Sequence, residues 1–142
     1  MGFVEAEHNE LAEFYRSNGL EVSDDIAVKD GAVYSIKLCQ NGRVQAAATL
    51  SLRFGVYILD YIAVDPVFRG RNLGALALNR ILEKAKEMGA DKLFITARNP
   101  SFFERFGFKE GSPQGVDMNF DCIGCPEYNN GCSKKPMYID IR

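Results

Sequence analysis

The chain has 142 residues, of which 46% are hydrophobic and 25% charged, and its formal net charge is -2. This length suits a single domain over residues 1–142 with one hydrophobic core, and it is too short for two comfortable domains. The slightly acidic balance argues against general nucleic-acid binding, which needs a basic surface. No apolar run reaches membrane-spanning length and the N-terminus has no signal pattern, so we expect a cytoplasmic protein with no membrane partner.

The first part of the chain predicts a helix followed by a hairpin. Residues Glu5 to Ser17 carry apolar side chains at helical spacing, so we expect a helix that packs on a sheet. Alternating apolar and polar residues then predict two strands, Ala32 to Cys39 and Val44 to Arg53. Between them, Asn41 and Gly42 form a two-residue turn that matches the twist of paired strands. The hairpin should be antiparallel with one buried face.

The next stretch, Val56 to Val64, is apolar on both faces, which is the pattern of a central strand. Asp60 is the one charged residue in it. A carboxylate in such a strand has to be paired, solvated by a cleft or functional. Two interpretations therefore stay open for Asp60, a structural pair or a catalytic or substrate-facing role.

A tight turn with Pro66 and Gly70 joins this strand to a helix that begins near Leu73. The unpaired N–H groups and the positive dipole of a helix N-terminus attract anions. Arg69 and Arg71 stand beside the turn, and the first helical turn has no acidic residue. The pattern predicts a phosphate site. The alternative is that Asn72 caps the helix while both arginines lie in solvent.

The helix stops at Gly89, and Lys92 to Ala97 reads as a strand. A strand, a helix and a strand with short joins predict a parallel pair with a right-handed crossover. We expect a short helix over Asn99 to Phe108, and then loop until a final strand over Pro136 to Ile141.

The segment 121–142 contains Cys122 and Cys125 at C-x-x-C spacing and then Cys132. Three thiolates could bind zinc, with Cys39, His8, Asp121 or a group outside the chain as the fourth ligand. Reduced thiols without a metal, or a redox-sensitive pair, are the alternatives.

The glycine turn lacks the P-loop and dinucleotide-fold patterns. It resembles the acetyl-CoA-binding motif of the GNAT family of N-acetyltransferases, Gln/Arg-x-x-Gly-x-Gly/Ala after V-x-P. Val64-Asp65-Pro66 leads here into Arg69-Gly70-Arg71-Asn72-Leu73-Gly74. Asn72 replaces the middle glycine of the family pattern. The ending resembles the tail of stand-alone N-acetyltransferases related to N-acetylglutamate synthase.

A second family pattern, Phe-Tyr-x-x-x-Gly-Phe, is similar to Phe102 to Phe108 of this chain. The tyrosine that often protonates the departing thiolate in the family is Phe103 here. Relatives of N-acetylglutamate synthase often carry a Phe-Phe pair at this point.

The resemblance implies an α/β (α+β) fold, with a mixed central sheet, an antiparallel N-terminal hairpin, a parallel β-α-β core and flanking helices. It implies transfer of an acetyl group from acetyl-CoA to a primary amine of a small molecule, an amino acid being one such acceptor. We expect Asp60 as the base and Tyr61 or Tyr138 as the acid. The residues expected to bind acetyl-CoA are Ile62, Ala63, Val64, Arg69, Gly70, Arg71, Asn72, Leu73, Gly74, Ala75, Asn99 and Phe103.

Two alternatives from other classes remain at this point. Phe103 and the altered glycine motif would suit a catalytically silent acyl-CoA-binding module. The cysteines would suit a metal- or redox-responsive regulatory module. A homodimer is compatible with the sequence.

Overall fold

The computed structural model describes residues 2–18, 32–53, 55–68, 70–97, 100–111 and 135–141. In chain order the elements are β1 (Val4–Ala6), α1 (His8–Ser17), β2 (Ala32–Gln40), β3 (Arg43–Arg53), β4 (Val56–Val64), η1 (Pro66–Phe68), α2 (Leu73–Glu87), β5 (Lys92–Ala97), α3 (Pro100–Glu104), β6 (Lys109–Glu110) and β7 (Lys135–Asp140).

The strands form one mixed sheet of seven strands in the order β1-β2-β3-β4-β5-β7-β6. β4 and β5 are parallel, and the other neighbouring pairs are antiparallel. The predicted hairpin turn is confirmed, because Asn41 and Gly42 have φ of 55° and 75°, as the tight turn requires. The predicted central strand and the parallel β4-α2-β5 crossover are confirmed as well.

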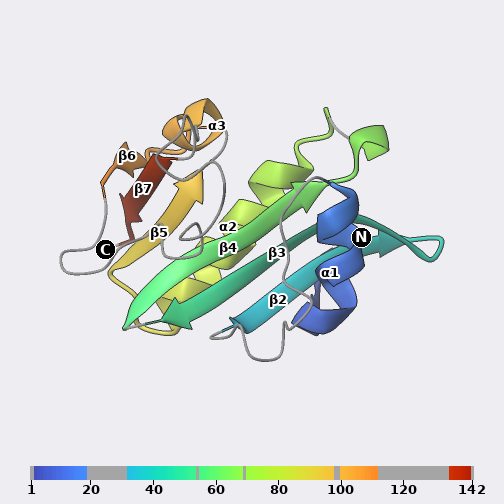
Figure 1. Cartoon of the computed structure of the whole chain (residues 1–142), viewed down its shortest axis with the longest axis horizontal. Helices are drawn as coiled ribbons and strands as arrows, with labels where there is room; N and C mark the ends of the chain where they lie inside the picture. The colour runs from blue at the N-terminus through green and yellow to red at the C-terminus, as the bar shows by residue number, and fades with distance from the viewer. Residues whose placement is uncertain are drawn as a thin grey trace, which may run out of the picture.

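The sheet separates two layers of helix, with α1 in front of it and α2 behind it in Figure 1. The larger core lies between the sheet and α2, and it includes Leu50 and Leu59 from the strands with Leu78 and Ile81 from the helix. The smaller core lies under α1 and is built from Leu11, Tyr15, Ala47, Tyr61 and Ala63. The two faces therefore bury different sets of side chains.

One extra residue in β4 shapes the middle of the sheet. Thr49 of β3 pairs with Tyr61, and the next residue, Leu50, pairs with Leu59, so Asp60 has no opposite residue on β3. This is a β-bulge, which bends a strand and increases its twist. Within the described strands, β4 and β5 share a single register pair, Ile58 with Phe94, just before the bulge. The carboxyl ends of β4 and β5 then diverge (Figure 1).

One prediction about the N-terminal part was wrong in detail. The helix expected from Glu5 begins at His8, and Val4–Ala6 forms the edge strand β1, paired with β2. The helix starts there because the Glu10 carboxylate accepts a hydrogen bond from the Glu7 backbone N–H at 2.8 Å, which satisfies a donor at the helix end. The Glu7 N–H, and then Lys37, hold the pKa of Glu10 below its usual range.

The C-terminal part also differs from the sequence-based expectation. The helix expected over Asn99 to Phe108 is a single short turn, α3, which ends at Glu104. Lys109–Glu110, expected as loop, forms β6 and pairs with β7. β6 has too few residues to show an alternating pattern in the sequence, so it forms a strand only because β7 lies beside it.

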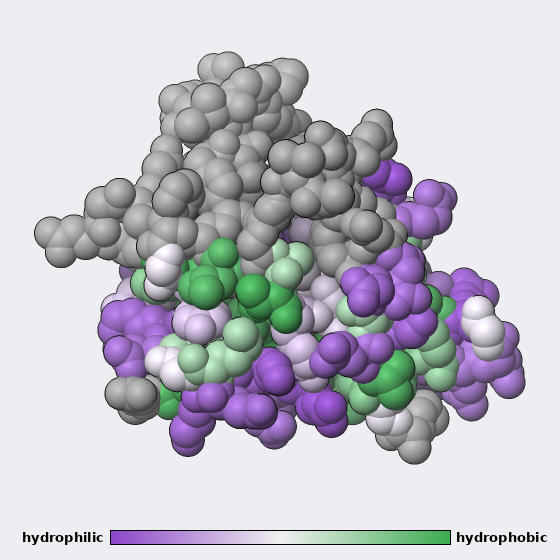
Figure 2. Space-filling model, turned by 90° about the horizontal axis from the view of Figure 1, so that it is seen from below, coloured by the Kyte–Doolittle hydropathy of each residue, from purple (hydrophilic) through white to green (hydrophobic). Residues whose placement is uncertain are grey.

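In Figure 2, the described part of the surface is a mixture of hydrophilic residues and smaller groups of hydrophobic residues. Among the described residues, the exposed large hydrophobic side chains include Val67 at 65% and Leu76 at 48%. Isolated exposures of this kind are normal in folded domains. No helix in the described part of the chain has the length and apolar character needed to cross a membrane.

A buried hydrogen-bond chain joins α1 to the sheet. The Tyr15 hydroxyl lies 2.8 Å from Thr49 Oγ1, which lies 3.0 Å from Ser35 Oγ. All three side chains are buried. Burial raises the pKa of Tyr15, so the phenol stays protonated and able to donate. These bonds satisfy polar groups that would otherwise destabilise the smaller core.

We expect Tyr15→Phe to lower the free energy of unfolding by about 1 to 3 kcal/mol, because a buried hydroxyl group loses its partner. Urea denaturation measures the change. Tyr57→Phe is the matched control, since the Tyr57 hydroxyl donates to the Met88 carbonyl at 3.2 Å in an exposed position. An equal loss in both variants would contradict a special contribution of the buried chain.

Candidate functional site

Beyond the bulge, one backbone edge of β4 pairs with β3. The other edge lies on the side of β5, from which β4 diverges. Ile62, Ala63 and Val64 pair with Ala48, Ala47 and Ala46 of β3. Their side chains are half-buried or, for Ala63, 9% exposed. The backbone of this segment, which the resemblance assigns to the coenzyme arm, therefore borders the diverging ends of the two strands.

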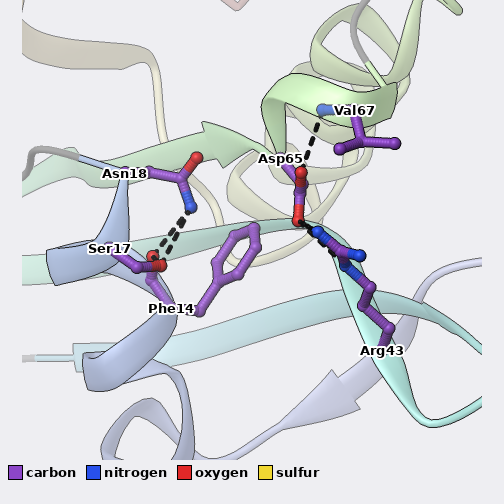
Figure 3. A network of polar contacts seen from close by, with 6 residues as sticks. All are labelled: Phe14, Ser17, Asn18, Arg43, Asp65 and Val67. Atoms are coloured by element: carbon purple, nitrogen blue, oxygen red, sulfur yellow. Dashed lines mark hydrogen bonds and ion pairs between the residues drawn. The ribbon is translucent and has the colours of Figure 1, made fainter.

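The turn after β4 is organised by Asp65, as Figure 3 shows. One carboxylate oxygen accepts hydrogen bonds from Arg43 Nη2 at 2.8 Å and Nε at 3.2 Å. The other accepts from the Val67 backbone N–H at 2.9 Å. The Asp65 N–H donates to the Gln45 carbonyl at 2.9 Å, which ties the turn to β3. Asp65 thereby fixes the direction in which the chain enters η1.

Phe14 reaches toward this turn from the last part of α1 (Figure 3). The Phe14 carbonyl accepts hydrogen bonds from Ser17 Oγ and Asn18 Nδ2, both at 2.8 Å, which closes the helix end. The Phe14 side chain is half-buried against the smaller core. The end of α1 is therefore anchored on the smaller core of the sheet.

Two arginines flank an aromatic ring next to the turn. The Arg43 guanidinium carbon lies 5.6 Å from the centre of the Phe68 ring, and that of Arg71 lies 5.4 Å from it. Cation–π attraction at such distances stabilises both cations near the ring. Arg71 is exposed, so its positive charge reaches solvent beside the start of α2.

The N-terminus of α2 matches the prediction of an open helix end. Asn72 occupies the N-cap position with φ 62° and ψ 23°, a left-handed conformation that asparagine tolerates better than most residues. Its side chain makes no capping hydrogen bond, and the first turn contains no acidic residue. The alternative that the Asn72 side chain caps the helix is therefore wrong.

Glycine is favoured at positions 70 and 74 for different structural reasons. Gly70 is exposed and has φ 85°, which favours glycine. A Cβ on Gly74 would lie 3.3 Å from the Phe102 ring, which is tighter than ordinary contact. Gly74 therefore lets α2 and α3 approach closely. Phe103, expected at the coenzyme, is 5% exposed and belongs to the larger core.

The three candidate catalytic residues lie on the two strands that flank β5, with Asp60 and Tyr61 on β4 and Tyr138 on β7. Asp60 is half-buried in the bulge, and its carboxylate accepts a hydrogen bond from the Ser51 hydroxyl. Tyr61 is 9% exposed and stacks on Tyr15, with ring centres 4.8 Å apart. Tyr138 lies beyond β5, with its ring centre 5.9 Å from that of Phe94. Asp60 thus has a polar partner, which is compatible with both interpretations that the sequence left open.

Several predicted site residues lie outside the described residues. These are Arg69, Asn99, Cys122, Cys125 and Cys132. Within the described ranges, no group of three or more His, Cys, Asp or Glu side chains could hold a metal ion. The zinc hypothesis concerns cysteines beyond those ranges and stays a prediction.

Sequence reasoning missed the residues that support the site rather than line it. Asp65 had a usable signal, because aspartate between a strand and a proline favours a turn. Arg43 and Ser51 had none, since their roles come from β3 lying beside β4 and its turn.

The chain is similar to several characterised acetyltransferases. Residues 3–108 match the acetyltransferase (GNAT) family model. The amino-acid acetyltransferase of Mycobacterium tuberculosis is 31% identical over 82 residues, which are 56% of this chain and 44% of the relative. The chain therefore spans less than half the length of that relative.

Solved structures share the fold. N-acetylglutamate synthase from Neisseria gonorrhoeae, complexed with coenzyme A and N-acetyl-glutamate, matches with a TM-score of 0.77 and 17% identity, over 99% of this chain and 35% of that one. A Mycobacterium tuberculosis protein in complex with CoA matches with a TM-score of 0.74 and 19% identity, over 99% of both chains. Because the family model covers most of the sequence, this chain belongs to the acetyltransferase (GNAT) family.

Proposed function

We propose that this protein transfers the acetyl group of acetyl-CoA to the primary amine of a small molecule, with an amino acid as the favoured class of acceptor. The observation that carries this proposal is the divergence of β4 and β5 beyond the pair Ile58 and Phe94 (Figure 1), together with the N-terminus of α2, whose first turn has no acidic residue. The amino-acid acetyltransferase and the N-acetylglutamate synthase among the similar proteins support the acceptor class.

The described residues fit a coenzyme with an anionic diphosphate. The backbone N–H groups at the start of α2, from Asn72 to Ala75, would receive the diphosphate, and Arg71 adds a positive charge beside them. The backbone of Ile62 and Val64 would pair with the coenzyme arm on the β5 side. When bound, acetyl-CoA supplies an activated acetyl group as a thioester.

Asp60 is our candidate for the base. An amine attacks a thioester carbonyl only as the neutral form, so a proton has to leave the acceptor nitrogen directly or through water. Asp60 lies at the bulge beside Ser51, and its carboxylate would take that proton. A backbone N–H of β4 beyond the bulge would stabilise the negative charge that develops on the carbonyl oxygen.

The departing thiolate needs a proton, and Tyr61 and Tyr138 are the candidates for its donor. Tyr61 follows the bulge directly and is held by the stack with Tyr15. Tyr138 sits on the other side of β5, with the Lys92 ammonium 5.6 Å from its ring centre. The family's usual tyrosine is replaced by Phe103, so this proton has to come from another group.

The diphosphate site predicts opposite effects of one substitution on stability and on binding. Ala75→Glu should stabilise α2 by about 0.3 to 1 kcal/mol, because a carboxylate in the first turn opposes the helix dipole. The same charge should repel the diphosphate and raise the Kd for CoA about tenfold or more, which is about 1.4 kcal/mol. Thermal unfolding and calorimetry with CoA measure the two effects.

Ala75→Gln is the matched control, since it has nearly the same shape without the charge. We expect its Kd for CoA to stay close to the wild-type value, and we expect salt to reduce the difference between the two variants. Equal CoA affinity in both variants and the wild type would place the diphosphate elsewhere.

A panel of amino acids and polyamines, assayed by thiol release from acetyl-CoA, tests the activity and the acceptor class. We expect amino acids to give the fastest turnover. On the best acceptor, Asp60→Asn should lower kcat by about 100-fold or more, as loss of a general base does, while the Kd for CoA stays unchanged.

Two outcomes would contradict these proposals. Unchanged kcat in a folded Asp60→Asn protein would remove Asp60 from the chemistry. CoA binding without turnover of any amine in the panel would favour the catalytically silent acyl-CoA-binding module instead.

A further inference from the structure

A serine of the neighbouring strand holds the carboxylate of the bulge. Ser51 of β3 is fully buried, and its hydroxyl donates a hydrogen bond to Asp60 Oδ2. Ser51 pairs with Ile58, which is also the residue where β4 still pairs with β5. The bond therefore crosses from β3 to β4 at the place where β4 turns away from β5.

The bulge explains how the two side chains meet. Thr49 and Ser51 lie two residues apart on β3, so both point to the α1 side of the sheet, where Thr49 contacts Tyr15. On β4, the opposite residues Tyr61 and Ile58 are three apart, because Asp60 is inserted between them. Asp60 consequently lies beside Ser51 on the same face, as their hydrogen bond requires.

The electrostatic effect of Asp60 on Tyr15 also indicates that the Asp60 carboxylate lies on the α1 side of the sheet. The raised pKa of Tyr15 is caused first by burial, and the negative charge of Asp60 also contributes to it. Asp60 is thus near the buried Tyr15 phenol, in a region where an unsolvated carboxylate is costly. A hydroxyl donor to a carboxylate makes a charge-assisted bond, roughly twice as strong as one between neutral groups.

We propose that Ser51 is a positioning residue, whose hydroxyl sets the orientation of the Asp60 carboxylate for proton transfer from the acceptor amine. This inference rests on the proposed role of Asp60 as the base. A hydrogen bond from β3 to one carboxylate oxygen restricts the rotation of the carboxylate, and so it also restricts the direction of the second oxygen. Ser51 itself takes no proton and contacts no reacting atom.

The experiment compares Ser51→Ala with Ser51→Thr, which keeps a hydroxyl, and with Ser35→Ala, which removes a different buried serine. Ser35 is 3% exposed and bonds to Thr49, so its loss costs a buried hydroxyl without touching Asp60. We expect Ser51→Ala to lower kcat between about 10-fold and 100-fold, as a misplaced catalytic group does, with KM for acetyl-CoA unchanged. Ser51→Thr and Ser35→Ala should retain most of the wild-type kcat.

A double-mutant cycle with Asp60→Asn separates positioning from a general loss of structure. If Ser51 acts through Asp60, Ser51→Ala should have little further effect on kcat in the Asp60→Asn protein. Thermal unfolding and CoA calorimetry on every variant confirm that each protein is folded. Should Ser51→Ala fail to fold, Ser51→Cys carries the test, with a kcat expected between those of the wild type and Asp60→Asn.

The outcomes distinguish this inference from the proposed function. If Asp60→Asn is impaired but Ser51→Ala behaves like Ser35→Ala, the positioning role is wrong and the role of Asp60 stands. If the two losses multiply in the double variant, Ser51 acts independently of Asp60 and the inference is overturned. If Asp60→Asn keeps full activity, the proposed base is wrong, and the positioning role is overturned with it.

Discussion

The extra residue in β4 is the constraint on which the rest of this molecule depends. With Asp60 inserted opposite the step from Thr49 to Leu50, β4 pairs with β5 at Ile58 and then bends away. A regular strand would continue its ladder with β5 and satisfy both backbone edges. The bulge instead places the Asp60 carboxylate beside Ser51, and β4 diverges from β5 beyond it (Figure 1). One insertion therefore supplies both the proposed acyl-coenzyme groove and the proposed base.

The two faces of the sheet differ in polarity. The face toward α2 is packed with aliphatic and aromatic side chains such as Leu59, Leu78 and Ile81, and it holds the crossover rigidly. The face toward α1 carries two polar contacts, one between Tyr15 and Thr49 and one between Ser51 and Asp60. Polar groups can lie there because each is hydrogen-bonded, so their burial costs little. A buried framework of this kind orients side chains more rigidly than an exposed loop would.

The start of α2 departs from the usual preferences of a helix N-terminus in a way that fits the proposed diphosphate site. A first turn without an acidic residue, behind a left-handed Asn72, gives up the stability that Asp or Glu would add there. The Asp65 carboxylate lies before the helix and accepts hydrogen bonds from Arg43 and the Val67 N–H. It therefore shapes the turn that leads into α2 without neutralising the helix N-terminus. The proposed diphosphate site would use this positive dipole, and Arg71 beside Phe68 adds a positive charge near it.

The sequence by itself determined those features whose cause lies within a few residues. The Asn41-Gly42 turn, the central strand β4, the length of α2 and its open N-terminus follow from local backbone preferences and apolar periodicity. Its family motif also indicated the fold. The tertiary structure alone decided that Asp60 is a bulge residue, that Ser51 holds it, and that Arg43 anchors Asp65, because these depend on strand register between residues distant in the chain. It likewise decided the strands β1 and β6, whose few residues become strands only where a longer neighbour offers its edge.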